Sequence, residues 1–70
     1  MSWNQLPEHR RNQITQELTP LQLKVLQHRL DGHSWRTIGL ALGIHEATAR
    51  GHHHAAIQRL RHALERKDAA

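Results

Sequence analysis

The sequence predicts a small all-α domain, and three features support that prediction. Apolar residues recur at helical spacing in three stretches, a capping residue precedes each of the first two, and a glycine follows each of those two. A chain of 70 residues holds one small core, and without cysteine that core has no disulfide or thiolate zinc site to support it. We therefore expect three to four helices, with an N-terminal arm or short helix over residues 1–17, the main domain over residues 18–66 and a tail over residues 67–70.

The first 17 residues are polar and have a weak helical pattern. Pro7 suits the first position of a helix, where its missing N–H costs nothing. Ile14 and Leu18 are one turn apart and would fall on the same side of a helix. The segment is therefore either a short helix or a partly ordered arm.

The clearest helix begins in the stretch LTPLQLKVL. Thr19 suits the cap, Pro20 suits the first helical position, and Gly32 suits the left-handed residue that ends a helix. These signals predict a helix over about residues 20–31. Its apolar residues are Leu23, Val25, Leu26 and Leu30.

The same pattern repeats in a shorter form in the stretch HSWRTIGLALG. Ser34 is the expected cap, Ile38 and Leu42 are the inward pair, and Gly43 ends the segment. This spacing predicts a helix of about two turns.

A third helix is predicted over about residues 45–64, after the apolar Ile44. Its apolar stripe, with one histidine in it, is expected to pack against the other helices, and its opposite side is free to touch a partner. The inward residues are Ala49, His53, Ala56, Ile57, Leu60 and Leu64. The outward residues are Glu46, Ala47, Arg50, Gly51 and His54.

Charge and composition narrow the choice of partner. Ten Lys and Arg against six Asp and Glu give a net charge of +4 with neutral histidines. A basic surface suits a polyanion, although a modest net charge also serves solubility alone. Because the chain has two Trp and no Tyr or Phe, it lacks an aromatic platform for single-stranded nucleic acid, and duplex is the better candidate.

Several other classes of function are not expected. No carboxylate pair or nucleophile–base set indicates an enzyme, and no cofactor is predicted. Successive helix positions turn by about 100°, so the rings of His52, His53 and His54 diverge and no metal site is predicted. With no membrane-length apolar run and no targeting pattern, we expect a cytoplasmic protein of a bacterium, phage or plasmid.

The predicted elements follow the order of a helix-turn-helix arrangement. A short helix, a glycine turn and a second short helix precede the LGI turn and the longer helix. The stretch LTPLQLKVLQHRLDGHSWRTIGLALGIHEATARGHH resembles, without a gap, the DNA-binding domain of LuxR/GerE-type regulators and the related fourth region of sigma factors. The resemblance covers about residues 18–61. The matching or conservatively substituted positions are Leu18, Thr19, Val25, Leu26, Gly32, Ser34, Ile38, Leu42, Gly43, Ile44, Thr48, Arg50 and His52.

The resemblance implies a transcriptional regulator that binds double-stranded DNA sequence-specifically, with the third helix as recognition helix in the major groove. Arg50 has the place of the family's basic DNA-contacting residue, and His52 has that of its histidine. Trp35 suits a phosphate contact and packing against the third helix equally well. The base-reading candidates are Glu46, Ala47, Arg50, Gly51 and His54. The phosphate candidates are Ser34, Trp35, Arg36, His45, Thr48 and His52.

The chain departs from the family pattern in its core. Ala49 stands where a valine is usual, and His28 and His53 stand where large apolar residues are usual. We expect a thinner and more polar core. If both histidines lie near it, acid pH should destabilise the fold, because a buried imidazole must then charge against desolvation.

Size favours a homodimer, because one short recognition helix contacts few base pairs and a second copy lengthens the site. The N-terminal arm and the C-terminal helix are both candidate interfaces. Two other functions stay open. One is a sigma-like or anti-sigma-like module that binds RNA polymerase, and the other is the DNA-binding subunit of a recombination or packaging complex.

Overall fold

The computed structural model describes residues 2–69, with side chains for residues 2–66. A short 3-10 turn, η1 (Trp3–Gln5), precedes four helices and no strand occurs in this range. The helices are α1 (Glu8–Glu17), α2 (Pro20–Leu30), α3 (Trp35–Leu42) and α4 (Glu46–Ala69). The predicted all-α class is confirmed.

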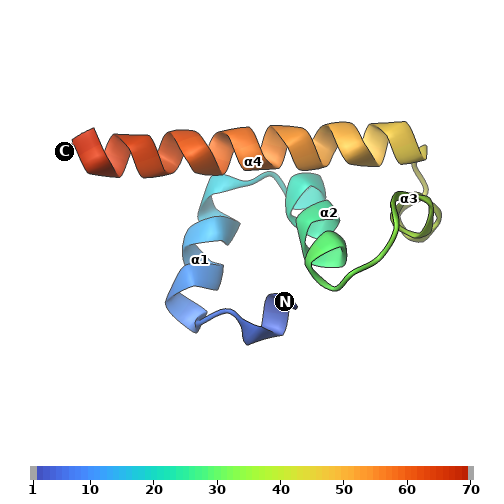
Figure 1. The fold of residues 1–70 in the computed structure, drawn as a ribbon, viewed down its shortest axis with the longest axis horizontal. Helices are drawn as coiled ribbons and strands as arrows, with labels where there is room; N and C mark the ends of the chain where they lie inside the picture. Colours follow the sequence, from blue (N-terminus) through green and yellow to red (C-terminus); the bar gives the residue numbers. More distant parts are fainter. Residues whose placement is uncertain (1, 70) are drawn as a thin grey trace.

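Helix α4 is the longest element and spans the length of the molecule (Figure 1). Its 24 residues correspond to about 36 Å of helix. Helices α1 and α2 lie on one side of α4 and run crosswise to it in Figure 1. Helix α3 is seen end-on below the N-terminal end of α4, so α3 crosses α4 steeply. Each of the shorter helices thus packs against a different part of α4.

Local side-chain bonds fix the predicted ends of the helices. Thr19 Oγ1 accepts a hydrogen bond from the Gln22 N–H at 3.3 Å, and Gln22 Oε1 accepts one from the Thr19 N–H at 3.1 Å, which makes a capping box before α2. Ser34 Oγ caps α3 by accepting from the Thr37 N–H at 3.2 Å. The two predicted stops are confirmed, because Gly32 (φ 89°) and Gly43 (φ 70°) adopt the left-handed conformation.

The N-terminal segment forms an ordered helix. Pro7 precedes α1 as its cap residue and does not occupy the first helical position. Ile14 of α1 packs on the core, and Leu18, which follows α1, is buried. Of the two alternatives for residues 1–17, the structure therefore has the short helix, and it belongs to the same packed body.

The core consists of two small clusters side by side along α4. One contains Leu18, Leu26 and Ala56, with partly buried residues of α1, α2 and α4 around it. The other contains Val25, Ile38 and Ala49, with Leu21, Trp35, Leu42 and Ile44 around it. Ala49 and Ala56 have small side chains, which agrees with the expected thinner core. The expectation of a more polar core is wrong, because no polar or charged side chain is buried among the described residues, and His28 and His53 are only half-buried.

The predicted inward stripe of α4 holds for its first part and fails at its end. Ala49 and Ala56 are fully buried, and His53, Ile57 and Leu60 are half-buried. Leu64 is 54% exposed, so its expected place in the core is wrong. The helix also continues to Ala69, so residues 67–69 of the predicted tail are helical.

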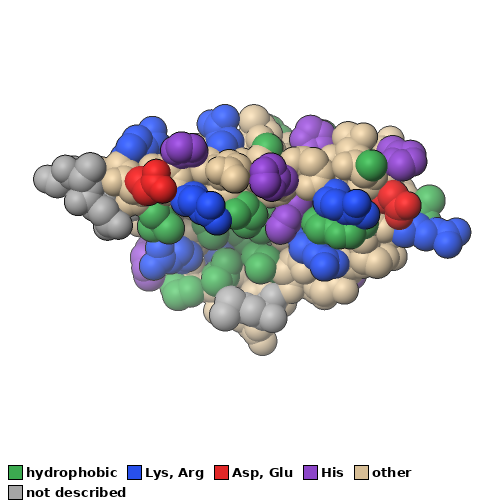
Figure 2. Space-filling model, turned by 45° about the horizontal axis from the view of Figure 1, so that its top comes forward, with side chains coloured by type: hydrophobic (Ala, Val, Ile, Leu, Met, Phe, Trp, Pro, Cys, Tyr) green, Lys and Arg blue, Asp and Glu red, His purple; other side chains and the backbone are tan. Residues whose placement is uncertain are grey.

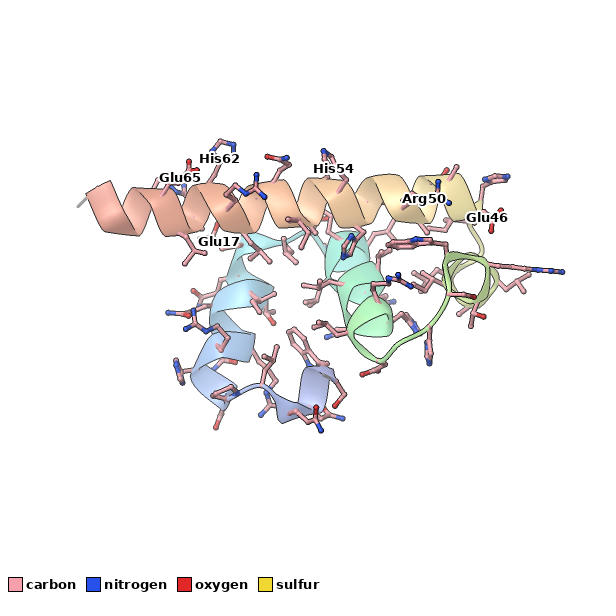
Figure 3. All side chains as sticks on the ribbon, viewed as in Figure 1. Glu17, Glu46, Arg50, His54, His62 and Glu65 are labelled. Atoms are coloured by element: carbon pink, nitrogen blue, oxygen red, sulfur yellow. The ribbon has the colours of Figure 1, made fainter. Side chains whose placement is uncertain are left out.

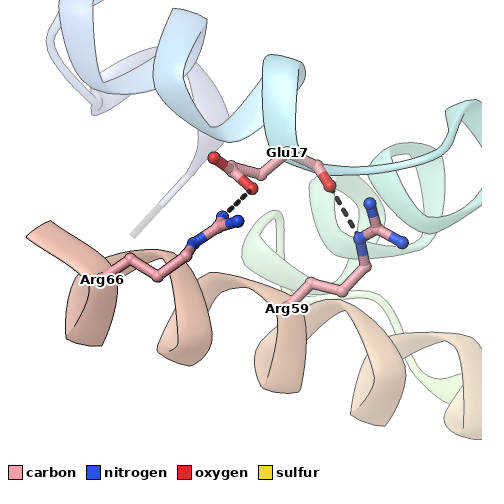
Figure 4. Close-up of polar contacts among 3 residues, drawn as sticks. All are labelled: Glu17, Arg59 and Arg66. Atoms are coloured by element: carbon pink, nitrogen blue, oxygen red, sulfur yellow. Dashed lines mark hydrogen bonds and ion pairs between the residues drawn. The ribbon is translucent and has the colours of Figure 1, made fainter.

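Two arginines fasten α1 to α4 (Figure 4). Arg59 Nε donates a hydrogen bond to the backbone oxygen of Glu17 at 2.8 Å, and Arg66 Nη2 lies 3.0 Å from Glu17 Oε2. The first bond satisfies a carbonyl that the end of α1 leaves free. Within residues 2–69, none of the helices has both the length and the apolar composition needed to span a bilayer.

Candidate nucleic-acid interface

The junction of α3 and α4 positions the predicted reading surface. A Cβ atom on Gly39 of α3 would lie 2.6 Å from the backbone oxygen of Ile44 and 3.2 Å from the nitrogen of Glu46. The Ile44 N–H also donates to the Gly39 oxygen at 2.9 Å. Only glycine permits this approach, and it holds the N-terminal end of α4 tightly against α3.

His45 caps α4. Its Nδ1 accepts a hydrogen bond from the Ala47 N–H at 3.0 Å, and its backbone oxygen accepts one from the Ala49 N–H at 3.0 Å. The first bond satisfies one of the amide groups that a helix N-terminus leaves free. A phosphate contact by this residue, as predicted, would therefore have to use the other ring nitrogen.

The five base-reading candidates form one exposed surface over the first turns of α4, which we call the reading face: Glu46, Ala47, Arg50, Gly51 and His54. Figure 3 shows Glu46, Arg50 and His54 following one another along the helix, with His54 pointing away from α2. In Figure 2, basic and histidine side chains are spread along this side of α4, with acidic side chains towards its two ends. The expected outward position of these residues is confirmed, and their contact with DNA stays a prediction.

The phosphate candidates differ in exposure and in whether their side chains already form hydrogen bonds within the fold. Arg36 and Thr48 are exposed, and His52 is half-buried. Ser34 is exposed, but its Oγ caps α3 and donates to Thr37 Oγ1 at 3.0 Å. Arg36 is the one charged side chain of this set that reaches into solvent beside the N-terminal end of α4.

Of the two alternatives for Trp35, a phosphate contact or packing against α4, the structure has the packing. Its half-buried ring contacts the cluster around Ile38 and meets the ring of His53 edge-on, with centroids 5.1 Å apart. The guanidinium of Arg29 lies over the Trp35 ring, with its Cζ 4.6 Å from the ring centroid. The tryptophan therefore joins α2, α3 and α4, which leaves Arg36 as the better phosphate candidate of the two.

The two histidines expected near the core lie in different surroundings. Burial, with the positive charge of Arg29 and the nearby His54, lowers the pKa of His53 below its ordinary value. His28 is half-buried, and its Nδ1 lies 3.1 Å from Nδ1 of His33, within hydrogen-bond distance, with the tautomers deciding which ring donates. Among the described side chains, no three His, Asp or Glu converge as metal ligands would.

Sequence reasoning missed Gly39, and it predicted a phosphate contact for His45 but not its role as a cap. A glycine inside an amphipathic helix costs about 1 kcal/mol relative to alanine, so its presence in the pattern TIGLAL was a signal of close backbone approach. Histidine is not among the preferred capping residues, and its role gave no comparable signal. Arg29 was missed as well, because its contact with Trp35 depends on how α2 meets α3.

Comparisons with protein-family models, with curated proteins and with solved structures gave no match for this chain.

Proposed function

We propose that the chain binds double-stranded DNA sequence-specifically and regulates transcription, with the reading face of α4 in the major groove. The observation that carries the proposal is the exposure of Arg50 and His54 on the first turns of α4. The contact at Gly39 holds this end of α4 against α3. Free amide groups and the helix dipole at that end favour phosphate, which adds to the attraction of the net charge of +4.

The dimensions of α4 fit this placement. A major groove about 12 Å wide admits an α-helix, whose diameter with side chains is about 10–12 Å, and the stretch from Glu46 to His54 supplies about 12 Å of helix along the groove. The remaining turns of α4 pack against α1 and α2 and lie outside the groove. Only the reading face would therefore contact base edges.

Three residues of the reading face have side chains suited to particular base edges. Arg50 can pair with both acceptors of a guanine, Glu46 can accept from a cytosine amino group, and Ala47 can touch a thymine methyl group. Arg36 lies beside the reading face and suits a phosphate, with Thr48 and His52 on α4 as further contacts. The proposal also implies that the protein is located in the cytoplasm, where the DNA is. It further implies that two copies of the chain bind one DNA site with two-fold symmetry.

Selection from random duplexes tests this proposal. The full chain should enrich one sequence with two-fold symmetry, and affinity for it should fall steeply as salt rises. No enrichment, or equal affinity for selected and random duplexes, would contradict sequence-specific binding.

Arg50→Ala tests the reading face itself. Loss of a bidentate guanine contact should weaken binding to the selected duplex by about 1–3 kcal/mol, or roughly fivefold to 150-fold, without changing the circular dichroism spectrum. Arg61→Ala is the matched control, because Arg61 is also exposed on α4 but lies in its C-terminal half. Equal losses for the two variants, measured by fluorescence anisotropy, would remove Arg50 from the recognition surface.

One observation favours a second candidate, a module that binds RNA polymerase. Leu40 on α3 is 77% exposed and borders an open hollow lined by Arg36, Gly39, Ile44, His45 and Glu46. An exposed leucine suits a protein surface better than a phosphate backbone. Retention of purified polymerase by the wild type, with loss in Leu40→Asp and none in Arg50→Ala, would favour this candidate.

A further inference from the structure

An apolar groove separates α1 from the C-terminal half of α4, and it encloses about 280 Å³. Its apolar lining consists of Ile14 of α1 and of Leu60, Ala63 and Leu64 of α4. Its polar edge belongs to α1 and consists of Arg10, Gln13, Gln16 and Glu17. Leu64 is itself 54% exposed, so part of this apolar surface is open to solvent.

The charges along the polar edge favour an anion. The described charged side chains that line the groove are those of Arg10 and Glu17. The carboxylate of Glu17 is already neutralised by Arg66, whose Nη2 lies 3.0 Å from Oε2. Arg10 forms no such ion pair with the described residues, and its Nη1 contacts the neutral side chain of Gln13. The groove therefore presents one unbalanced positive charge beside an apolar surface.

Arg10 and Gln13 also keep hydrogen-bond donors at this edge. They are neighbours on one face of α1, and Arg10 Nη1 donates to Gln13 Oε1 over a long distance of 3.4 Å. This bond leaves the other guanidinium N–H groups and the amide nitrogen of Gln13 to donate to a ligand. A guanidinium can give two parallel hydrogen bonds to one carboxylate. The edge therefore suits a carboxylate better than an amine or a neutral group.

The apolar lining sets the size and class of the ligand. Ligand pockets combine mostly apolar walls with a few polar groups that fix the orientation of the ligand. A cavity of about 150 Å³ holds benzene, so a groove of about 280 Å³ has room for roughly ten carbon atoms. All four apolar side chains of the lining are aliphatic, and the groove is partly open, so a flexible chain suits it better than a flat ring.

We propose that the groove binds a medium-chain aliphatic carboxylate, with the carboxylate at Arg10 and the chain over Ile14 and the leucines of α4. Arg10 lies about two turns, or about 10 Å of helix axis, before Glu17, where α1 meets α4. Side chains on a helix tilt towards its N-terminus, so the guanidinium lies at the end of the groove away from α4. The charged and apolar ends of the ligand thus meet matching ends of the groove.

The ligand would join two helices that few contacts hold together. Ile14 of α1 packs on the core, and the described side-chain hydrogen bonds between α1 and α4 are those of Arg59 and Arg66 to Glu17. A chain that touches both sides of the groove binds only the folded protein and therefore raises its melting temperature. The reading face lies at the other end of α4 (Figure 1), so this proposal does not rest on DNA binding.

Titration of the labelled full chain with decanoate, without DNA, tests the proposal by NMR. Ligands of this size gain a limited free energy per atom, so we expect a dissociation constant of about 0.1–1 mM. Backbone amides should shift at residues 10–17 and 60–64 and not at the reading face. Decyltrimethylammonium has the same chain and a positive head group, so Arg10 repels it, and it should bind about fivefold more weakly.

Two pairs of variants separate the head contact from the chain contact. Arg10→Gln should raise the dissociation constant of decanoate about fivefold. Arg61→Gln is its matched control, because it removes the same charge from an exposed position outside the groove. Leu64→Ser should also weaken binding about fivefold, whereas Leu40→Ser, at an exposed leucine of α3 outside the groove, should bind like the wild type. All four positions are exposed, so the variants should keep the helical spectrum of the wild type.

The absence of groove shifts, equal binding of decanoate and its cationic analogue, or equal losses for Arg10→Gln and Arg61→Gln would overturn the proposal. So would groove amides that shift when the chain alone is concentrated and do not respond to decanoate, because a second copy would then be the occupant. If Leu64→Ser unfolds, the Arg10 pair and the cationic analogue still decide. A chain that binds the selected duplex but not decanoate retains the proposed function and loses only the ligand site.

Discussion

Three consecutive histidines occupy three different positions on α4. His52 is half-buried at the edge of the reading face, His53 turns inward against Trp35, and His54 is exposed beside Arg50. The rotation of about 100° per residue accounts for this division. At the scale of single residues, the run HHH is therefore one packing residue between two candidates for DNA contact.

The environment of His53 predicts a dependence of stability on pH. Burial and the positive charge of Arg29 lower its pKa in the folded state, whereas in the unfolded chain it titrates near its ordinary value of about 6.5. As pH falls through that value, the unfolded chain binds the proton first, so the free energy of unfolding decreases until the folded state is protonated too. Thermal unfolding between pH 8 and pH 5.5 should thus show a falling melting temperature.

Two variants isolate this effect. His53→Leu should flatten the pH profile, and His9→Gln, at an exposed position of α1, should keep the slope of the wild type. A wild-type melting temperature that is constant over this range would contradict the role given to His53.

At the scale of elements, the helix ends were predictable and the approach of α3 to α4 was not. Thr19, Ser34, Gly32 and Gly43 act on groups a few residues away, so their roles can be read from local sequence. The contact at Gly39 joins two helices across a turn and depends on their crossing geometry.

Gly39→Ala should weaken this junction. The added methyl group would meet the Ile44 oxygen at 2.6 Å, and that oxygen belongs to backbone that cannot move aside without shifting α4. Overpacking costs about 1–3 kcal/mol, partly offset by about 1 kcal/mol of helix propensity. We expect a lower melting temperature and weaker binding to the selected DNA.

Gly51→Ala is the matched control, because an added Cβ there meets nothing within 4 Å. Helix propensity alone should then stabilise the fold by about 1 kcal/mol. Chemical denaturation measures both variants, and a Gly39→Ala protein as stable as Gly51→Ala would show that the close approach is not required.

The exposure of Leu64 marks where sequence periodicity stops being informative. The three-and-four spacing indicates which side of α4 a residue occupies, but not how far the neighbouring helices extend along it. Helices α1 and α2 cover Ala56 and Leu60, and α4 continues past them. The outward residues of the first turns were predictable because α3 and α2 cover the opposite side there.

At the scale of the whole molecule, α4 carries two surfaces at opposite ends. Its N-terminal turns present the reading face beside α3, and its C-terminal half forms the groove with α1. The bonds from Arg59 and Arg66 to Glu17 hold α1 in place on the groove side. One continuous helix, α4, thus connects the two surfaces.

The most direct test of the central claim is to map, by NMR, the backbone amides of the labelled chain that shift when the selected duplex is added. We predict that the shifts cluster at residues 34–36 and 45–54 and spare α1, and that Arg50→Ala reduces them at equal DNA concentration. Shifts centred on α1 or on the C-terminal half of α4, or no shifts at any DNA concentration, would contradict the assignment of the reading face.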